Sequence, residues 1–255
     1  MSEEILKKII SKKEYSQINM NDVEKVFNLF KNKRISEEEK IKRTRRILHE
    51  IFGVFLTKKI LKNKKLIPEE ILKNHISTKE RFPYYKKIYR RIFKGLKEFS
   101  VVDLGCGVNG FSYIFFKELG YNVNYLGIDS VTIFSEISNA FFNKNNFRGK
   151  VLETSLFSLK EIKKAIIKQK KPRVLLLMKV IDSLEKVERN HTKKLLFEIS
   201  GYFERIVLSV PTESLIKRKK FLVKRNWISN FIKENFLILD SFEIPSEKFF
   251  VFRAK

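Results

Sequence analysis

The chain has 255 residues, of which 54 are Lys or Arg and 29 are Asp or Glu, so its formal net charge is +25. Hydrophobic residues make up 43% of the chain and include 24 Phe, which is enough to bury a core and excludes a disordered basic tail. The single cysteine, Cys106, excludes an intramolecular disulfide and a cysteine-based zinc site.

The charge and the missing targeting signals favour a cytoplasmic protein that binds a polyanion. The first ten residues do not resemble a signal peptide, and no uncharged apolar run reaches the roughly 18 residues of a membrane span. Each phosphate that Lys or Arg neutralises releases a counterion, so a strongly basic protein of this size favours nucleic acid. An acidic membrane surface is the alternative.

Residues 1–98 carry 27 Lys and Arg against 13 Asp and Glu and show helical rather than strand periodicity. One predicted helix has an apolar face with the spacing i, i+3, i+4, i+7, formed by Val23, Val26, Phe27 and Phe30. Ser36 followed by Glu39 predicts the start of a second helix, over about residues 37–61.

The second helix has a nearly continuous basic side. Its apolar side would be buried, which leaves the basic side free to lie on phosphates. The alternative is a solvated Lys-rich surface without a function. The basic residues concerned are Lys40, Lys42, Arg43, Arg45, Arg46, Lys58, Lys59, Lys62, Lys64 and Lys65.

From residue 99 the pattern changes to strands that alternate with helices, which indicates a parallel α/β sheet. The last two strands lie close together across Pro245, which predicts an antiparallel hairpin. We therefore expect a basic helical domain over residues 1–98 and an α/β domain over residues 99–255. The predicted strands cover 99–104, 123–128, 149–153, 173–178, 205–210, 236–243 and 248–253, and the predicted helices cover 111–119, 131–144, 157–169, 189–200 and 219–233.

A strand followed by a glycine-rich turn, residues 101–110 (VVDLGCGVNG), is the clearest chemical motif. Gly105 and Gly107 have no Cβ, so a nucleoside can lie against the turn, and Asp103 ends the strand. Asp129 ends the next strand, where an acid can accept the ribose hydroxyls. A dinucleotide-binding fold is the rival, but the third glycine of its pyrophosphate motif is absent. The motif favours S-adenosylmethionine and a Rossmann-like methyltransferase fold.

These residues resemble those of the aminoglycoside-resistance 16S ribosomal RNA methyltransferases, which methylate N7 of a guanine in the decoding region. The most specific match is 75–83 (HISTKERFP), which is similar to the family pattern H-A-S-T-x-E-R-L-P. The other matches are 103–109 (DLGCGVN), 177–179 (LMK) with 184–185 (LE), and 209–215 (SVPTESL). Gly110 and Asp182 stand where many members have Pro.

The resemblance implies a set of cofactor contacts. Arg81 would hold the carboxylate of the methionine moiety, for which a guanidinium is a matched two-pronged donor. Glu153 and Thr154 would contact adenine, although Thr154 departs from the usual apolar residue. The implied cofactor residues are His75, Ile76, Ser77, Arg81, Asp103, Gly105, Gly107, Asp129, Glu153, Thr154 and Met178. No metal site is expected.

The resemblance also implies a second basic surface, which contacts RNA. Lys179 would approach the target nucleotide, and Trp227 either stacks on a base or packs beside Phe231 on one helix face. The expected RNA contacts are Lys58, Lys59, Lys179, Lys217, Arg218, Lys219 and Lys220.

Methylation of N7 needs no general base, because this nitrogen has a lone pair and no proton, so no catalytic residue is assigned. The resemblance implies 16S rRNA in the 30S subunit as the partner, and we expect a monomer. Two alternatives stay open, a methyltransferase of another structured RNA such as tRNA, and a catalytically silent assembly factor. Housekeeping modification and aminoglycoside resistance are equally compatible with these residues.

Overall fold

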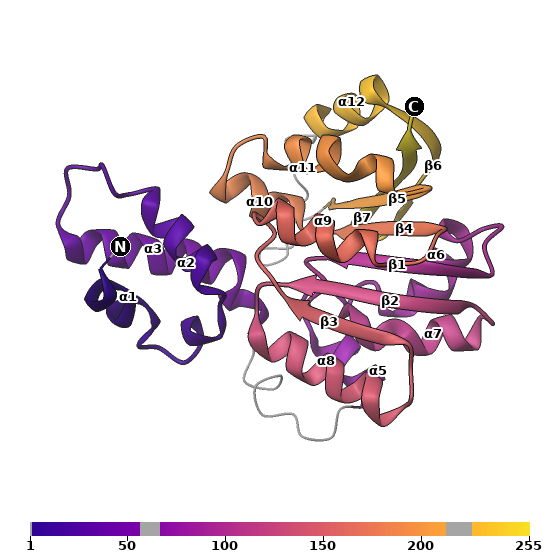
Figure 1. Ribbon diagram of the computed structural model, residues 1–255, viewed down its shortest axis with the longest axis horizontal. Coiled ribbons are helices and arrows are strands. Elements are labelled where there is room, and N and C mark those ends of the chain that lie inside the picture. The colour runs from indigo at the N-terminus through magenta and orange to yellow at the C-terminus, as the bar shows by residue number, and fades with distance from the viewer. Residues whose placement is uncertain (1, 57–66, 213–225) are drawn as a thin grey trace.

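The computed structural model describes residues 2–56, 67–212 and 226–255. It contains one seven-stranded sheet with helices on both faces, and a group of N-terminal helices beside the carboxyl ends of β2 and β3 (Figure 1). Lys58, Lys59, Lys217, Arg218, Lys219 and Lys220 lie outside the described residues.

The sheet has the predicted strands in the order β3-β2-β1-β4-β5-β7-β6. The first five are parallel, and β7 is antiparallel to both β5 and β6. The chain order reverses between β1 and β4, and in such sheets ligands bind outside the carboxyl ends of the strands at that point. The strands are β1 (Glu98–Leu104), β2 (Asn122–Asp129), β3 (Gly149–Glu153), β4 (Arg173–Met178), β5 (Arg205–Pro211), β6 (Phe236–Ile244) and β7 (Glu247–Ala254).

Helices cover both faces of the sheet because its central strands are apolar on both sides. Successive residues of β1 enter opposite layers, so Val101 belongs to one apolar cluster and Val102 to the other. The first layer contains α5 (Pro68–Asn74), α6 (Tyr85–Ile92), α7 (Tyr113–Glu118) and α8 (Thr132–Lys144). The second contains α9 (Leu159–Ile167), α10 (Ile181–Val187), α11 (His191–Ile199) and α12 (Asn226–Asn235).

Three helices, α1 (Glu3–Ile10), α2 (Met20–Asn28) and α3 (Glu37–Ile51), enclose a third cluster. The predicted face of α2 is confirmed, since Val23, Val26 and Phe27 are buried. Ser36 caps α3 as predicted, accepting a hydrogen bond from the Glu39 amide at 3.2 Å. The predicted extension of this helix to residue 61 is wrong. The backbone of Phe52 leaves the helical conformation, and a short 3-10 turn, Gly53–Phe55, follows.

The apolar clusters group the chain differently from the expected division at residue 98. Helices α5 and α6 contribute Ile71, Leu72, Ile88 and Ile92 to the cluster that also contains strand residues such as Val101. The N-terminal cluster consists of residues between 9 and 51 together with Val187. In packing terms, residues 68–92 belong with the sheet.

The expected packing of Trp227 beside Phe231 is wrong. The buried face of α12 is formed by Ile228, Phe231 and Ile232, whereas Trp227 is 38% exposed. Ile228, Phe231 and Ile232 have the spacing i, i+3, i+4 and form the middle of the buried face of the helix. Trp227 lies at the edge of that face.

A buried ion network joins the segment after α5 to the terminal hairpin. Arg81 donates from Nη2 to Oε1 of Glu247 at 2.9 Å and from Nε to Oε2 at 3.2 Å. Lys179 Nζ lies 2.8 Å from a Glu80 oxygen and 3.5 Å from Glu247. Arg81, Lys179 and Glu247 are each at most 2% exposed at the side chain. The two buried cations are therefore balanced by two carboxylates supplied from distant parts of the sequence.

We expect Glu247→Gln to lower the free energy of unfolding by about 3 kcal/mol or more, because removing one partner leaves a buried charge uncompensated. Urea unfolding followed by circular dichroism measures this change. Glu243→Gln is the matched control on the same hairpin, since Glu243 pairs with Lys248 at 3.0 Å on the surface. The control should cost less than about 1 kcal/mol. Equal losses in the two variants would contradict the role of the network.

Candidate active site

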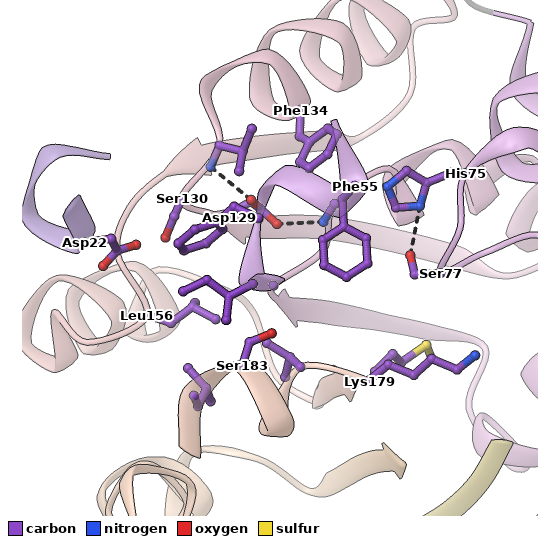
Figure 2. A pocket seen from close by; sticks show the side chains of 18 of the residues that line it. Asp22, Phe55, His75, Ser77, Asp129, Ser130, Phe134, Leu156, Lys179 and Ser183 are labelled. Carbon is purple, nitrogen blue, oxygen red and sulfur yellow. Dashed lines mark hydrogen bonds between the residues drawn. The ribbon is translucent and has the colours of Figure 1, made fainter. Parts of the chain in front are cut away.

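A cavity opens at the carboxyl ends of β1, β2 and β4. Figure 2 shows Asp129 in its middle, with Asp22 and Ser130 on one side and His75, Ser77 and Lys179 on the other. The lining residues are Asp22, Ile51, Phe52, Phe55, His75, Ser77, Gly105, Gly107, Asp129, Ser130, Val131, Phe134, Leu156, Phe157, Met178, Lys179, Val180, Ser183 and Leu184.

The turn after β1 needs glycine at two positions. Gly105 has φ of +69° and Gly107 has φ of +51°, in the left-handed region that side chains disfavour. A Cβ on Gly105 would lie 2.5 Å from Cγ2 of Val180, so there is no room for one. The turn thus exposes bare backbone to the cavity, as the sequence motif predicts.

Asp129 is fixed at the end of β2 by the turn that it faces. Its Oδ2 accepts a hydrogen bond from the Gly107 amide at 2.7 Å, and its Oδ1 accepts one from the Val131 amide at 3.0 Å. Burial raises the pKa of Asp129 to about 6, although the two amides act in the opposite direction. Each oxygen keeps a lone pair, so the oriented carboxylate can accept further hydrogen bonds from a ligand.

His75 presents a neutral ring to the cavity. Its Nδ1 is 2.8 Å from the Ser77 hydroxyl, and the ring stacks on Phe55 and meets Phe134 edge-on. Burial, with the nearby charge of Arg81, lowers the pKa of His75 to about 3. Its Nε2 is buried and forms no hydrogen bond with the described residues. The ring therefore has one polar atom left for a ligand.

Arg81 does not line the cavity, contrary to the expectation that it grips a ligand carboxylate. The Glu247 carboxylate already occupies the guanidinium as a two-pronged acceptor. Burial opposes the charged form, but Glu247 and Tyr85 raise the pKa of Arg81 above its ordinary value. In this structure Arg81 pairs within the protein.

Lys179 does line the cavity, but its ammonium group is held by Glu80 and Glu247. Its backbone is in the left-handed region, with φ of +58°, and its amide donates to the backbone oxygen of Ser209 at 3.2 Å. The neighbouring Met178 both lines the cavity and packs in the core. Contact of Lys179 with a target nucleotide stays a prediction.

Asp103 supports the turn from below. It accepts hydrogen bonds from the Asn109 amide group and the Tyr125 hydroxyl, each at 2.7 Å. Burial raises its pKa to about 6. Cys106 is buried as expected for a small packing residue, and burial raises the pKa of its thiol.

The residues expected to contact adenine do not line the cavity. Glu153 is exposed, and neither it nor Thr154 lines the cavity; Leu156 and Phe157 do. Ile76 is also absent from the lining. Contact of Glu153 and Thr154 with adenine therefore stays a prediction.

Sequence reasoning missed the wall supplied by the N-terminal helices, namely Asp22, Ile51, Phe52 and Phe55. The apolar side of the predicted second helix includes Ile51, Phe52 and Phe55. Such a pattern predicts that these residues are buried, but it does not predict that they contact a ligand. For Asp22 the sequence carries no such signal.

A second hollow lies over α1 and α3, and its lining includes Lys12, Lys42 and Arg46 beside acidic and apolar residues. Arg45 also lines this hollow, but it donates to the backbone of Ile9 at 3.2 Å and to the Ser11 hydroxyl at 3.0 Å. Arg45 is therefore held at the C-terminal end of α1, and its contact with phosphate stays a prediction.

Two features are absent from the described ranges, residues 2–56, 67–212 and 226–255. These ranges contain no group of three or more His, Cys, Asp or Glu residues placed to hold a metal ion. They also contain no helix long and apolar enough to cross a membrane.

Solved structures with a similar fold include two 16S rRNA methylases. RmtF, crystallised with S-adenosyl-L-homocysteine, is 21% identical with a TM-score of 0.80 and full coverage of both chains. RmtB is 20% identical with a TM-score of 0.78, covering 99% of this chain and 98% of that one. These likenesses confirm the predicted Rossmann-like methyltransferase fold.

Curated relatives include two 16S rRNA (guanine(1405)-N(7))-methyltransferases. The protein from Proteus mirabilis is 30% identical over an alignment of 158 residues, and the match covers 50% of this chain and 54% of the relative. The protein from Frankia casuarinae is 26% identical over an alignment of 205 residues, and the match covers 72% of this chain and 68% of the relative. The chain thus spans about half the length of the first relative and about two thirds of the second.

A family model described as "Ribosomal RNA methyltransferase (FmrO)" matches residues 64–234, which is more than half of the chain. That range contains the HISTKERFP segment, the glycine turn and Asp129. The resemblance predicted from the sequence is therefore confirmed, and the chain belongs to the FmrO family of ribosomal RNA methyltransferases.

Proposed function

We propose that this chain transfers a methyl group from S-adenosylmethionine to N7 of a guanine in the decoding region of 16S rRNA, the nucleotide numbered 1405 in the names of its relatives. The observation that carries the proposal is the oriented carboxylate of Asp129 beside the bare backbone of Gly105 and Gly107. Family membership supplies the reaction class and the RNA class.

The lining residues fit the proposed cofactor. Asp129 can accept hydrogen bonds from ribose hydroxyls, and the glycine turn presents backbone without side chains to the cavity. Two buried polar atoms on the lining, Nε2 of His75 and Oδ2 of Asp22, have no partner among the described residues. Buried polar atoms require hydrogen bonds, so these two indicate a polar ligand.

When bound, the cofactor supplies an electrophilic methyl group. The residues of the cavity need only orient the reactants and exclude water, since N7 of guanine attacks with its own lone pair. A neutral His75 suits this chemistry, because it places no extra positive charge where a cationic sulfonium would lie. The apolar side chains of Phe55, Phe134 and Leu156 exclude water from the same space.

The partner is, in this proposal, the 30S subunit, and the enzyme acts as a cytoplasmic monomer. The net charge of +25 supports a polyanionic partner. The N-terminal helices carry basic residues around the hollow over α1 and α3.

The activity is tested with radiolabelled S-adenosylmethionine and 30S subunits, naked 16S rRNA or tRNA. Borohydride and aniline cleave RNA at N7-methylguanine, and reverse transcription maps the cut. We expect one cut in the decoding region, with 30S subunits as the substrate. Label confined to tRNA, or binding to 30S subunits without label in any RNA, would contradict the proposal and favour the alternatives named above.

Asp129→Asn should weaken binding of S-adenosylhomocysteine roughly tenfold or more, a loss of about 1.4 kcal/mol. Both carboxylate oxygens accept backbone amides, so an amide group at this position sets an N–H donor against one of them. Isothermal calorimetry measures the affinity. Glu136→Gln, which makes the same charge change on the exposed side of α8, is the control and should bind as tightly as the wild type. Unchanged affinity in Asp129→Asn would contradict the assignment.

The affinity for S-adenosylhomocysteine should fall as the pH is lowered through about 6, where Asp129 takes up a proton. The ionised carboxylate accepts hydrogen bonds, whereas the protonated one presents a donor to groups that are themselves donors. Calorimetry between pH 5 and pH 8 should show a loss of at most about tenfold per pH unit for one proton. Asp103 also has a pKa of about 6, so Asp129→Asn separates the two groups. Persistence of the dependence in that variant would assign it elsewhere.

A further inference from the structure

Asp22, in the first turn of α2, belongs to the N-terminal helices and yet lines the cavity. It is 1% exposed, although carboxylates are seldom fully buried. Its Oδ1 accepts a hydrogen bond from the Ser155 hydroxyl, while Oδ2 forms none with the described residues. A buried carboxylate oxygen without a donor is costly, so the geometry calls for a donor from a ligand.

The position of Asp22 in the cavity indicates which part of a nucleoside it meets. Ser155 follows β3, and Asp129 ends β2, so Asp22 lies on the β3 side of the residue that suits ribose. Figure 2 shows the same order, with Asp22 on the opposite side of Asp129 from His75 and Lys179. The methionine part lies toward the glycine turn and β4 in this arrangement, and the base lies toward Asp22.

Backbone contacts hold Asp22 in this place. The Asn19 amide donates to the carbonyl of Ser130 at 2.8 Å, and Ile18 forms an antiparallel bridge with Val131. On the next turn of α2, Lys25 pairs with Glu188 at 2.6 Å and lies over the ring of Phe157. The start of α2 is therefore fastened to the loop that follows β2 and to the end of α10.

The surroundings of Asp22 suit a purine with an amino group. Leu156, Phe157 and Val131 supply apolar surface on the same side of the cavity. Burial raises the pKa of Asp22, and the nearby hydroxyls of Ser130 and Ser155 oppose that rise, although only the Ser155 hydroxyl donates a hydrogen bond to the carboxylate. The edge of adenine carries one exocyclic amino group, which is the donor that a free carboxylate oxygen lacks.

We propose that Asp22 is a specificity residue for the cofactor, whose Oδ2 accepts a hydrogen bond from the exocyclic amino group of adenine. This inference rests on the proposed function, because it assumes an adenosyl cofactor. It assigns to the N-terminal helices a direct part in cofactor selection, besides any contact with RNA.

The test compares S-adenosylhomocysteine with S-inosylhomocysteine, in which an oxo group replaces the amino group. The wild type should bind the adenosyl compound at least about tenfold more tightly by calorimetry, which is 1.4 kcal/mol for one hydrogen bond to a charged group. In Asp22→Asn the amide can accept from the amino group or donate to the oxo group. That variant should therefore bind both compounds with affinities within about threefold of each other.

Asn19→Ala is the matched control, because it changes the same helix start and keeps the carboxylate. Asn19 caps α2 through its side chain, which accepts from the Asn21 amide at 3.1 Å. The control should keep the wild-type preference even where its thermal stability falls. Loss of the preference in the control, or its retention in Asp22→Asn, overturns the role of Asp22.

The wild type alone keeps the proposal falsifiable if Asp22→Asn does not fold. Equal affinity of the wild type for the adenosyl and inosyl compounds overturns it without any variant. Failure of the assumed adenosyl cofactor gives a different result, since the wild type then binds neither compound, whereas a different RNA target leaves both affinities as they are. Binding of S-adenosylhomocysteine without a preference removes only the inference about Asp22.

Discussion

The buried carboxylate of Glu247 is the constraint on which the arrangement of the site depends. It faces the guanidinium of Arg81 and the ammonium of Lys179 at once, in a region closed to water. Isolated charges of this kind cost several kcal/mol, so the segment after α5, the end of β4 and the start of β7 are stable only together. The glycine turn and Asp129 lie at the neighbouring ends of β1 and β2, and β1 pairs directly with β4.

Helices α5 and α6 pack in the core of the sheet, while α1, α2 and α3 have a core of their own. The HISTKERFP segment therefore belongs to the catalytic part of the molecule, where His75 supplies a neutral ring to the cavity. The N-terminal helices reach the same cavity from outside, through Asp22 and the residues around Phe52.

The fold was predictable because its signals are local. Alternating strands and helices, the glycine turn and the cap at Ser36 each depend on a few adjacent residues, and all are present. Tertiary pairing was not predictable in this way. Arg81 has the right chemistry for a ligand carboxylate, but the fold brings Glu247, 166 positions away, to its two donors. Asp22 likewise gains its place only because Ile18 and Asn19 bind to the loop after β2. The second predicted helix ends earlier than its apolar pattern indicates, because the backbone of Phe52 leaves the helical conformation.

The bridge between Ile18 and Val131 has a thermodynamic meaning beyond its effect on shape. Because α2 forms part of the cavity wall, the position of the N-terminal helices and the occupancy of the cavity share one equilibrium. Linkage then requires reciprocity. A macromolecule that fixes those helices tightens the binding of the small molecule by some factor, and the small molecule tightens the binding of the macromolecule by the same factor. Two antiparallel residues are a small contact, but together with Val187 in the N-terminal cluster and the pair of Lys25 with Glu188 they join the N-terminal helices to the rest of the molecule.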